Sequence, residues 1–234
     1  KLSSKHPSPF SSKVVSSQTD ASGAAKLAIQ LHDGGIIECV LLTDKEGDLT
    51  ACLSSQVGCA MGCRFCRTGT LRFKRNLADY EIIEQFAHLC HIAEKPITHV
   101  VFMGMGEPLA NIDNVVSAVS FLHDPEGYNL SHRRITISTC GLVPGILDLS
   151  NRKVPVKLAV SLVTANDEKR SFLMPVNRSF NLAQLRNALV RFQKVSGRRF
   201  TLEYCMIHDM NISASDADDL KRFCNGLEVV VNLI

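Results

Sequence analysis

The spacing of apolar positions changes along the chain and divides it into three parts. Residues 1–24 are polar and show no hydrophobic period, which predicts a flexible lead-in. Residues 25–55 contain three strand-like apolar runs, and an Asp-Gly-Gly sequence at 33–35 predicts a hairpin between the first two. Residues 56–234 alternate between short apolar runs and longer segments with apolar residues at helical spacing.

The third part follows a repeating strand–helix order. Apolar runs predict strands at 98–104, 133–138, 156–162, 199–207 and 227–234. Apolar residues at helical spacing predict a helix that starts near Asn76 and further helices near 115–122, 142–150, 181–192 and 213–224. Apolar strands that alternate with helices imply a parallel sheet that is buried on both faces.

The number of strands favours a partial barrel. We expect about six strands after the cysteine cluster described below, and a closed eight-fold barrel takes about 250 residues. The predicted fold class is therefore α/β: a partial (β/α)6 barrel over residues 56–234, with a small N-terminal β extension over residues 25–55. Ligands of parallel α/β folds bind at the carboxyl ends of the strands. That rule selects four loops, at 59–66, 104–108, 138–141 and 161–163.

Composition narrows the class of protein. The 234 residues are 45% hydrophobic and 21% charged, which is ordinary for a soluble globular protein. No apolar run reaches the length of a membrane span, and the N-terminus lacks the apolar core of a secretory signal. The net charge of +3 permits a polyanionic partner without requiring one. Nine unevenly spaced cysteines do not indicate a disulfide framework, and they favour a metal site in a reducing, cytoplasmic compartment.

Three of the cysteines, Cys59, Cys63 and Cys66, lie close together in the sequence CAMGCRFC. Thiolates bind zinc, copper(I) and iron–sulfur clusters, and a closed zinc site takes four ligands. A four-iron cluster takes one cysteine per iron, so three cysteines leave one iron open to a small molecule. The C-x3-C-x2-C spacing at the mouth of a barrel resembles the signature of the radical S-adenosylmethionine (SAM) superfamily, which implies a 4Fe-4S cluster held by these cysteines.

Longer stretches are similar to one family within that superfamily. CLSSQVGCAMGCRFCRTG, VFMGMGEPLANIDNV, RRITISTCG, SLVTANDEKRSFLMPVN and VVVNLI together resemble the RlmN/Cfr family of RNA methyltransferases, over about residues 27–234. The resemblance implies methylation of an adenine ring carbon in 23S rRNA and in some tRNAs, with SAM as the methyl donor. RlmN-type members act at C2 and Cfr-type members at C8. Because SSQVGC is more similar to RlmN-type sequences, adenine C2 is the expected target.

The sequence GMGEP follows a predicted strand and supplies candidate SAM-binding groups. Gly104 and Gly106 allow the backbone to approach a ligand closely, and the carboxylate of Glu107 suits the ammonium group of SAM. By resemblance, four further residues line the SAM pocket: Ser138, Ser161, Leu162 and Val163. The chain departs from the family pattern at Val163, where His is common, and at Cys140, where Ser is usual.

The resemblance also assigns two catalytic residues. Adenine C2 is electrophilic, and the family methylates it through a methyl group first placed on a C-terminal cysteine. Cys52 is expected to resolve the intermediate by forming a disulfide with that cysteine, and Glu38 is expected to be the proton acceptor. Without the resemblance, Cys52 is better interpreted as a buried strand cysteine and Glu38 as an exposed side chain.

Both ends of the chain indicate a piece of a longer protein. It starts at Lys1 and stops at Ile234 inside an apolar run. The methyl-carrying cysteine is expected beyond Ile234, so we predict that these 234 residues hold the cluster and bind SAM weakly but do not methylate RNA by themselves. We expect a monomer that receives electrons from a donor such as flavodoxin.

Basic residues near the cysteines are candidates for RNA contact. They are Arg64, Arg67, Arg72, Lys74 and Arg75 around the cysteine loop, and Arg133 and Arg134 in a second group. Such side chains neutralise phosphates, but a solvated basic face fits them equally well. Two other functions stay open: another radical SAM enzyme, such as a glycyl-radical activase or a sulfur-inserting enzyme, and a non-catalytic zinc-binding module of an RNA-associated protein.

Overall fold

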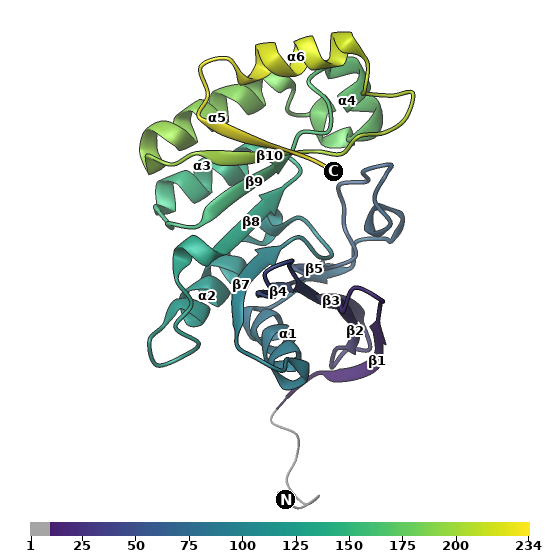
Figure 1. Cartoon of the computed structure of the whole chain (residues 1–234), viewed down its shortest axis with the longest axis vertical. Coiled ribbons are helices and arrows are strands. Elements are labelled where there is room, and N and C mark those ends of the chain that lie inside the picture. Colours follow the sequence, from purple (N-terminus) through teal and green to yellow (C-terminus); the bar gives the residue numbers. More distant parts are fainter. Residues whose placement is uncertain (1–9) are drawn as a thin grey trace, which may run out of the picture.

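One sheet of nine strands runs through the molecule in the computed structural model, which describes residues 10–234 (Figure 1). In spatial order its strands are β1 (Lys13–Thr19), β2 (Ala25–Gln30), β3 (Ile36–Thr43), β4 (Leu49–Cys52), β7 (Ile97–Phe102), β8 (Ile135–Thr139), β9 (Lys157–Ser161), β10 (Phe200–Tyr204) and β11 (Val229–Leu233). A separate two-stranded ladder pairs β5 (Gln56–Val57) with β6 (Arg75–Asn76).

The direction of strand pairing changes at β4. The neighbours from β1 to β4 are antiparallel, whereas β4, β7, β8, β9, β10 and β11 are parallel to one another. Ala51 of β4 pairs with Leu41 of β3 on one side and with Val100 of β7 on the other. β4 is therefore the first of six parallel strands, and five of them follow the cysteines. The predicted number of six barrel strands is confirmed, but the first of them precedes the cysteines instead of following them. In the sequence β4 follows a hairpin and is therefore indistinguishable from the third strand of a meander.

Six α-helices accompany the described strands. They are α1 (Asp79–Ile92), α2 (Ile112–His123), α3 (Val143–Arg152), α4 (Asp167–Leu173), α5 (Leu182–Ser196) and α6 (Ala214–Cys224). Short 3-10 helices occupy Thr68–Thr70, Pro108–Asn111, His132–Arg134 and Pro175–Arg178. In Figure 1, α2, α3 and α5 lie along one side of the parallel strands. Within residues 10–234, every helix is too short or too polar to cross a bilayer.

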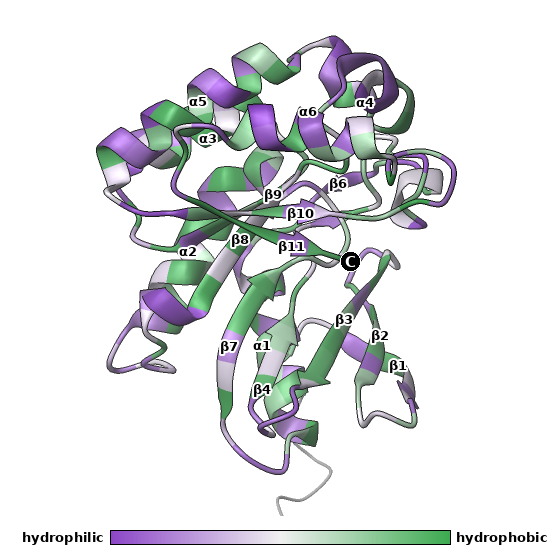
Figure 2. Ribbon diagram, turned by 45° about the horizontal axis from the view of Figure 1, so that its top comes forward, coloured by the Kyte–Doolittle hydropathy of each residue, from purple (hydrophilic) through white to green (hydrophobic). Residues whose placement is uncertain are grey.

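The hydrophobic core lies where these helices cover the sheet. On α1, Ile82, Phe86 and Leu89 recur at helical spacing and are almost completely buried. On β8, Ile135 and Ile137 occupy alternate positions and are also buried. Figure 2 shows hydrophobic stretches along β3, β7 and β11. Because each large apolar side chain contributes about 2 kcal/mol on burial, the two sequence periods together fix which face of each element turns inward.

Three local predictions differ from the structure. The sequence predicts a flexible lead-in over residues 1–24, but β1 lies within it; residues 1–9 are outside the described part. The side chains of β1 are almost all exposed, so this edge strand has no hydrophobic period to detect. The first helix starts at Asp79 rather than near Asn76, because the N–H of Ala78 donates to the carboxylate of Glu81 at 2.9 Å. The short helix α4 was not predicted.

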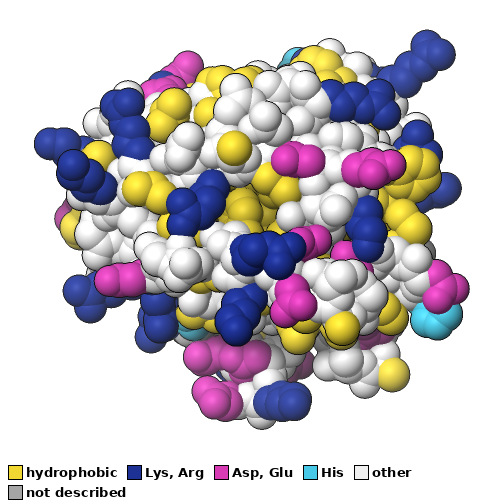
Figure 3. Space-filling model, turned by 90° about the horizontal axis from the view of Figure 1, so that it is seen from above, with side chains coloured by type: hydrophobic (Ala, Val, Ile, Leu, Met, Phe, Trp, Pro, Cys, Tyr) yellow, Lys and Arg dark blue, Asp and Glu magenta, His cyan; other side chains and the backbone are white. Residues whose placement is uncertain are grey.

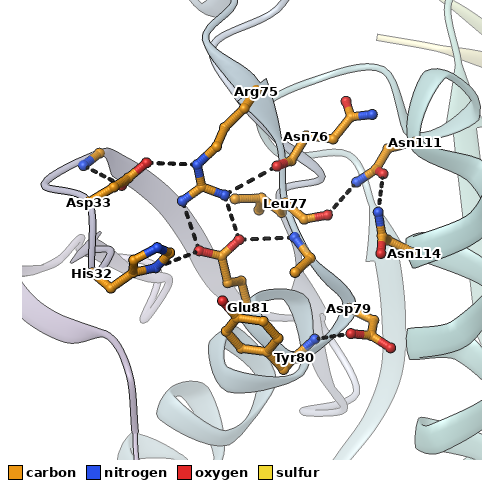
Figure 4. Close-up of polar contacts among 12 residues, drawn as sticks. His32, Asp33, Arg75, Asn76, Leu77, Asp79, Tyr80, Glu81, Asn111 and Asn114 are labelled. Atoms are coloured by element: carbon orange, nitrogen blue, oxygen red, sulfur yellow. Dashed lines mark hydrogen bonds and ion pairs between the residues drawn. The ribbon is translucent and has the colours of Figure 1, made fainter.

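Arg75 connects the end of the cysteine loop to the following helix and to a hairpin that lies 42 residues earlier in the chain (Figure 4). Its nitrogens Nη1 and Nη2 donate to the buried carboxylate of Glu81 on α1 at 2.7 and 2.8 Å, and Nε donates to Asp33 in the β2–β3 hairpin at 2.7 Å. Burial by itself raises the pKa of Glu81, but the hydrogen bonds from Arg75 and Ala78 and the Arg75 charge outweigh it, so this pKa lies below its usual value. Arg75 thereby holds the hairpin, the end of the cysteine loop and α1 together.

We predict that Arg75→Leu lowers the free energy of unfolding by about 3 kcal/mol at neutral pH, because it leaves the Glu81 carboxylate buried without its cation. Because the pKa of Glu81 is depressed in the folded protein, this contribution is present above the ordinary value of 4.5 and is lost as the pH falls through the lower folded value. Urea unfolding at several pH values measures both effects. Arg152→Leu, which removes an exposed cation paired with Asp113 and Asp148, is the control and should cost less than about 1 kcal/mol. Equal losses for the two variants would contradict this account.

Candidate functional site

The three clustered cysteines lie in a loop that folds tightly on itself. The N–H of Cys66 donates to the carbonyl of Cys63 at 3.1 Å, and the N–H of Gly69 donates to the carbonyl of Cys66 at 3.0 Å. A Cβ atom on Gly69 would lie 2.6 Å from the Cys63 carbonyl oxygen, so only glycine fits there. The N–H of Arg64 donates to Leu173 at 2.9 Å and joins the loop to α4.

This loop meets three strand-end loops around one cavity of about 460 Å³. The cavity is lined by Cys59, Met61, Cys63, Phe65, Cys66, Phe102, Met103, Gly104, Gly106, Glu107, Pro108, Ser138, Thr139, Cys140, Ser161, Met174, Glu203, Asn232 and Ile234. The structure therefore brings the three cysteines together with Gly106, Glu107, Ser138 and Ser161 at the carboxyl edge of the parallel sheet. Another cavity, of about 690 Å³, lies between β1–β4 and the end of α1, but its lining has no cysteine and only Glu94 and Lys95 as charged residues.

The thiols suit a four-iron cluster better than a single ion. Burial raises the pKa of Cys63 to about 12, with the neighbouring Cys59 and Cys66 adding to the effect, and burial also raises the pKa of Cys59. Iron binding would therefore release protons. Among the described residues, no three His, Cys, Asp or Glu side chains converge closely enough to share one metal ion. A four-iron cluster takes one cysteine per iron and needs ligands spread around a larger group. Three thiols around an open cavity fit that group.

Cys140 is a fourth thiol at this cavity, but it already forms a hydrogen bond. Its thiol donates to the carboxylate of Glu107, and burial, followed by the nearby Glu107 charge, raises the pKa of Cys140 well above the usual value. A thiol that donates to a buried carboxylate is poorly disposed to become a thiolate ligand. Cys140 therefore belongs to the cavity wall, and the assignment of Cys59, Cys63 and Cys66 as cluster ligands stays a prediction.

Glu107 is built into the wall of the cavity. It is 2% exposed, and its Oε1 and Oε2 accept from the N–H groups of Leu109 and Cys140 at 3.1 and 2.7 Å. Burial raises the pKa of Glu107, and the hydrogen bonds only partly oppose that shift. Gly106 has φ +103°, and a Cβ there would lie 2.6 Å from the Gln56 side chain. The GMGEP loop can therefore lie this close to the segment after β4 only because the position is glycine.

Two of the predicted SAM-pocket residues lie behind the wall. Leu162 and Val163 are at most 1% exposed and are not in the cavity lining. Their N–H groups donate to the carbonyl of Glu203 at 3.1 and 3.3 Å, so they attach the end of β9 to β10. Val163 adopts φ +63°, which is rare for a β-branched residue. The carbonyl of Val163 accepts from Nδ2 of Asn211 at 2.6 Å, which holds this conformation.

The two predicted catalytic residues also lie outside the cavity lining. Cys52 is 9% exposed at the end of β4, where burial raises its pKa to about 11. All nine cysteines in the described part of the chain are free, and Cys52 lies close enough to Cys39 of β3 for the two thiols to interact electrostatically. Glu38 has a side chain 47% exposed and forms an ion pair with Lys26 at 3.1 Å. These surroundings match the interpretation made without the family resemblance, and the catalytic roles stay predictions.

Three polar residues of the site were not predicted from the sequence. Glu203 and Asn232 line the cavity, and Nδ2 of Asn232 donates to Oε2 of Glu203 at 2.7 Å. Both lie toward the carboxyl ends of the last two strands, so the strand-end rule finds them when it is applied to every strand. Arg170 on α4 lies behind the wall and is fully buried. No local period predicts its burial.

Comparison with known proteins agrees with this geometry. The profile of the radical SAM superfamily matches residues 53–221. A probable dual-specificity RNA methyltransferase RlmN from Treponema pallidum (strain Nichols) is 47% identical over 222 residues, covering 95% of this chain and 65% of the relative. The corresponding protein of Moorella thermoacetica is 48% identical over 216 residues, covering 89% and 61%. The chain therefore spans less than two thirds of the length of these relatives.

Solved structures point the same way. The crystal structure of a radical SAM methyltransferase from Sphaerobacter thermophilus superposes with a TM-score of 0.91 at 40% identity, covering 95% of this chain and 66% of that one. HydG, a maturase of the FeFe-hydrogenase, superposes with a TM-score of 0.57 at 17% identity, which shows a shared fold only.

We predict that Gly106→Ala lowers the free energy of unfolding by about 3 kcal/mol, because it combines backbone strain with a steric clash. Gly34→Ala is the matched control: Gly34 also has a positive φ, of +79°, but a Cβ there meets nothing within 4 Å. Strain alone should cost that variant about 1 kcal/mol. Urea denaturation of both variants tests the difference, and similar losses would show that the loop is not packed as described.

Proposed function

Because this chain belongs to the radical SAM superfamily, we propose that it forms the core of a methyltransferase that adds a methyl group to C2 of adenine in 23S rRNA or tRNA. One observation carries the proposal. The three-cysteine loop, the GMGEP and STCG loops and Ser161 at the end of β9 meet at one cavity, in a chain 47% identical to a relative named RlmN. The adenine C2 target rests on that relative's name and on the resemblance of SSQVGC.

The residues around the cavity divide into two groups by chemistry. The superfamily uses a 4Fe-4S cluster and SAM, and Cys59, Cys63 and Cys66 would hold the cluster. When bound, the cluster would supply the electron that cleaves SAM, and SAM would supply the methyl group. Electrophilic C2 cannot obtain this methyl group by attacking SAM directly. Glu107 offers its buried carboxylate to the ammonium group of SAM, which would offset the cost of its burial. The remaining polar wall, from Ser138 and Ser161, offers hydroxyl groups to the ligand.

An acid-free segment supports RNA as the substrate. From Leu49 to Ala78 the chain has no Asp or Glu but five Lys and Arg residues. Of these, only Arg75 forms an ion pair within the described residues, so four cations of the cysteine loop have no acidic partner there. Unpaired cations beside a site are available to phosphates. Figure 3 shows the face seen from above, where cationic, acidic and hydrophobic side chains are interspersed.

Exposed aromatic rings lie among these cations. Phe65, Phe73 and Phe172 are each more than 40% exposed, and the guanidinium carbon of Arg64 lies 4.0 Å from the ring centroid of Phe172. Unstacked RNA bases bind to such aromatic and guanidinium planes. These features favour RNA contact at the cysteine loop over a merely solvated basic face. Arg133 and Arg134 precede β8 and lie at its amino end, at the opposite edge of the sheet from the cavity.

The localisation, the oligomeric state and the electron donor are also part of this proposal. We expect the protein to act in the cytoplasm as a monomer, with electrons from a small donor such as flavodoxin. Cys52 and Glu38 keep their proposed roles as the resolving thiol and the proton acceptor. Because both lie outside the cavity lining, those roles require substrate to reach the end of β4 and the exposed face of β3.

Iron loading tests the ligand assignment. We predict that anaerobic reconstitution of the wild-type chain gives about four irons per chain, and that Cys63→Ser loses at least half of this iron. Cys140→Ser is the matched control at the same cavity and should keep it, because the Cys140 thiol donates to Glu107. Iron and zinc analysis with visible absorbance gives the readout. Stoichiometric zinc without iron would support the zinc-module alternative, and iron loss in Cys140→Ser would make that residue a ligand.

Product analysis tests the reaction. We predict that the longer protein containing this chain converts adenosine of 23S rRNA or tRNA to 2-methyladenosine, detected by mass spectrometry of the digested RNA. Cys52→Ala should abolish turnover, whereas Cys39→Ala, which removes the adjacent buried thiol, should retain it. Equal activity in both variants would remove the resolving role from Cys52. An iron-loaded protein that cleaves SAM without methylating RNA would instead favour another radical SAM reaction.

A further inference from the structure

Arg170 is a buried cation that the proposed reaction does not use. It lies on α4 and is 0% exposed. Its Nε donates to the carbonyl of Leu162 at 3.1 Å, and Nη2 donates to the carbonyls of Cys140 and Ser161 at 2.7 and 3.2 Å. Nη1 donates to Oδ1 of Asn177 at 3.0 Å. All four acceptors are neutral oxygens.

The charge of Arg170 has no bonded counter-ion among residues 10–234. Its nearest carboxylate partner is indirect: Asn177 accepts from Arg170 and donates through Nδ2 to Oδ1 of Asp167 at 2.9 Å. Asp167 lies on an exposed part of α4, where solvent screens it. A buried cation with neutral partners is costly unless a further anion compensates it.

The position of Arg170 shows where that anion would lie. The backbone of Cys140 lies between two charged groups, because the N–H of Cys140 donates to Glu107 and the carbonyl of Cys140 accepts from Arg170. Cys63 packs in the same small cluster as Cys140, Leu173 and Met174. The guanidinium therefore backs the cavity wall on the side of the cysteine loop.

We propose that Arg170 is a positioning residue whose buried charge balances the iron–sulfur cluster and makes its one-electron reduction easier. This inference rests on the proposed function, since it requires the cluster. Three thiolates outweigh the charge of an oxidised four-iron core, so the assembled group is an anion, and the electron from the external low-potential donor makes it more negative. A fixed cation in a dry wall stabilises the more negative form more strongly. Its three carbonyl contacts also hold the ends of β8 and β9 in place around the cavity.

The effect of the Arg170 charge is tested by measuring the reduced fraction of the cluster at a fixed potential. The reconstituted wild-type chain and its variants are equilibrated anaerobically with a redox-buffered reductant, and the reduced cluster is counted by electron paramagnetic resonance. Arg170→Gln should lower the ratio of reduced to oxidised cluster on the order of tenfold. Arg170→Lys keeps the charge and should stay within about threefold of wild type, although it loses the guanidinium fork. Lys169→Gln, which removes the neighbouring, partly exposed cation that pairs with the buried Asp216, is the control and should leave the reduced fraction unchanged.

A second variant covers the case in which Arg170→Gln fails to load iron. Asn177→Asp leaves Arg170 in place but puts a carboxylate at the position that now accepts its Nη1. It is made together with Asp167→Asn, because Nδ2 of Asn177 donates to Oδ1 of Asp167 and two carboxylates in contact would share a proton. This variant should lower the reduced fraction in the same direction. Wild-type reduced fractions in Arg170→Gln or Asn177→Asp chains that hold the cluster would overturn this inference alone. Equal losses in Arg170→Lys and Arg170→Gln would also overturn it, in favour of a purely structural role. A wild-type chain that takes up no iron would overturn the proposed function itself.

Discussion

The parallel pairing of β4 with β7 is the constraint on which the site depends. β4 ends at Cys52, a few residues before the cysteine loop, and pairs with β7 in the same direction. The segment after β4 and the GMGEP loop after β7 therefore leave the sheet at the same edge. An antiparallel pairing would send these two loops to opposite ends of the sheet. Since β4 also pairs antiparallel with β3, the small N-terminal extension is continuous with the sheet that carries the site.

Contacts between the strand-end loops then shape the cavity. Glycine lets the GMGEP loop approach the chain after β4, and Glu107 ties that loop to Cys140 after β8. Arg170 joins the ends of β8 and β9 from behind. Each of these polar groups is buried and hydrogen-bonded, so displacement of one loop would leave partners in the others unsatisfied. The wall is therefore held as one unit, which suits a site that must place a cluster and SAM side by side.

The charges of the site are arranged in layers. The buried carboxylate of Glu107 and the buried guanidinium of Arg170 lie on either side of the Cys140 backbone. They lie behind thiols such as Cys63, whose pKa is raised by burial. Outside them, the cysteine loop presents exposed aromatic rings and cations that have no acidic partner among residues 10–234. The inner layer suits a small ligand with an ammonium group that is bound beside an anionic cluster. The outer layer suits a polyanion with accessible bases.

Much of the fold was predictable from the sequence, because strands and helices follow periods of two and about four residues that apolar side chains reveal locally. The cysteine spacing and the strand-end rule likewise identified the loops that meet at the cavity. The sequence could not show that Leu162 and Val163 lie behind the wall, or that Arg170 is buried there. Burial of a polar or turn residue depends on neighbours thirty or more residues away, as with Arg170 and Cys140. Chain order and spacing thus determined the elements and the predicted cluster ligands. Tertiary packing alone decided which side chains face the cavity and where Arg170, which has no bonded counter-ion among residues 10–234, is buried.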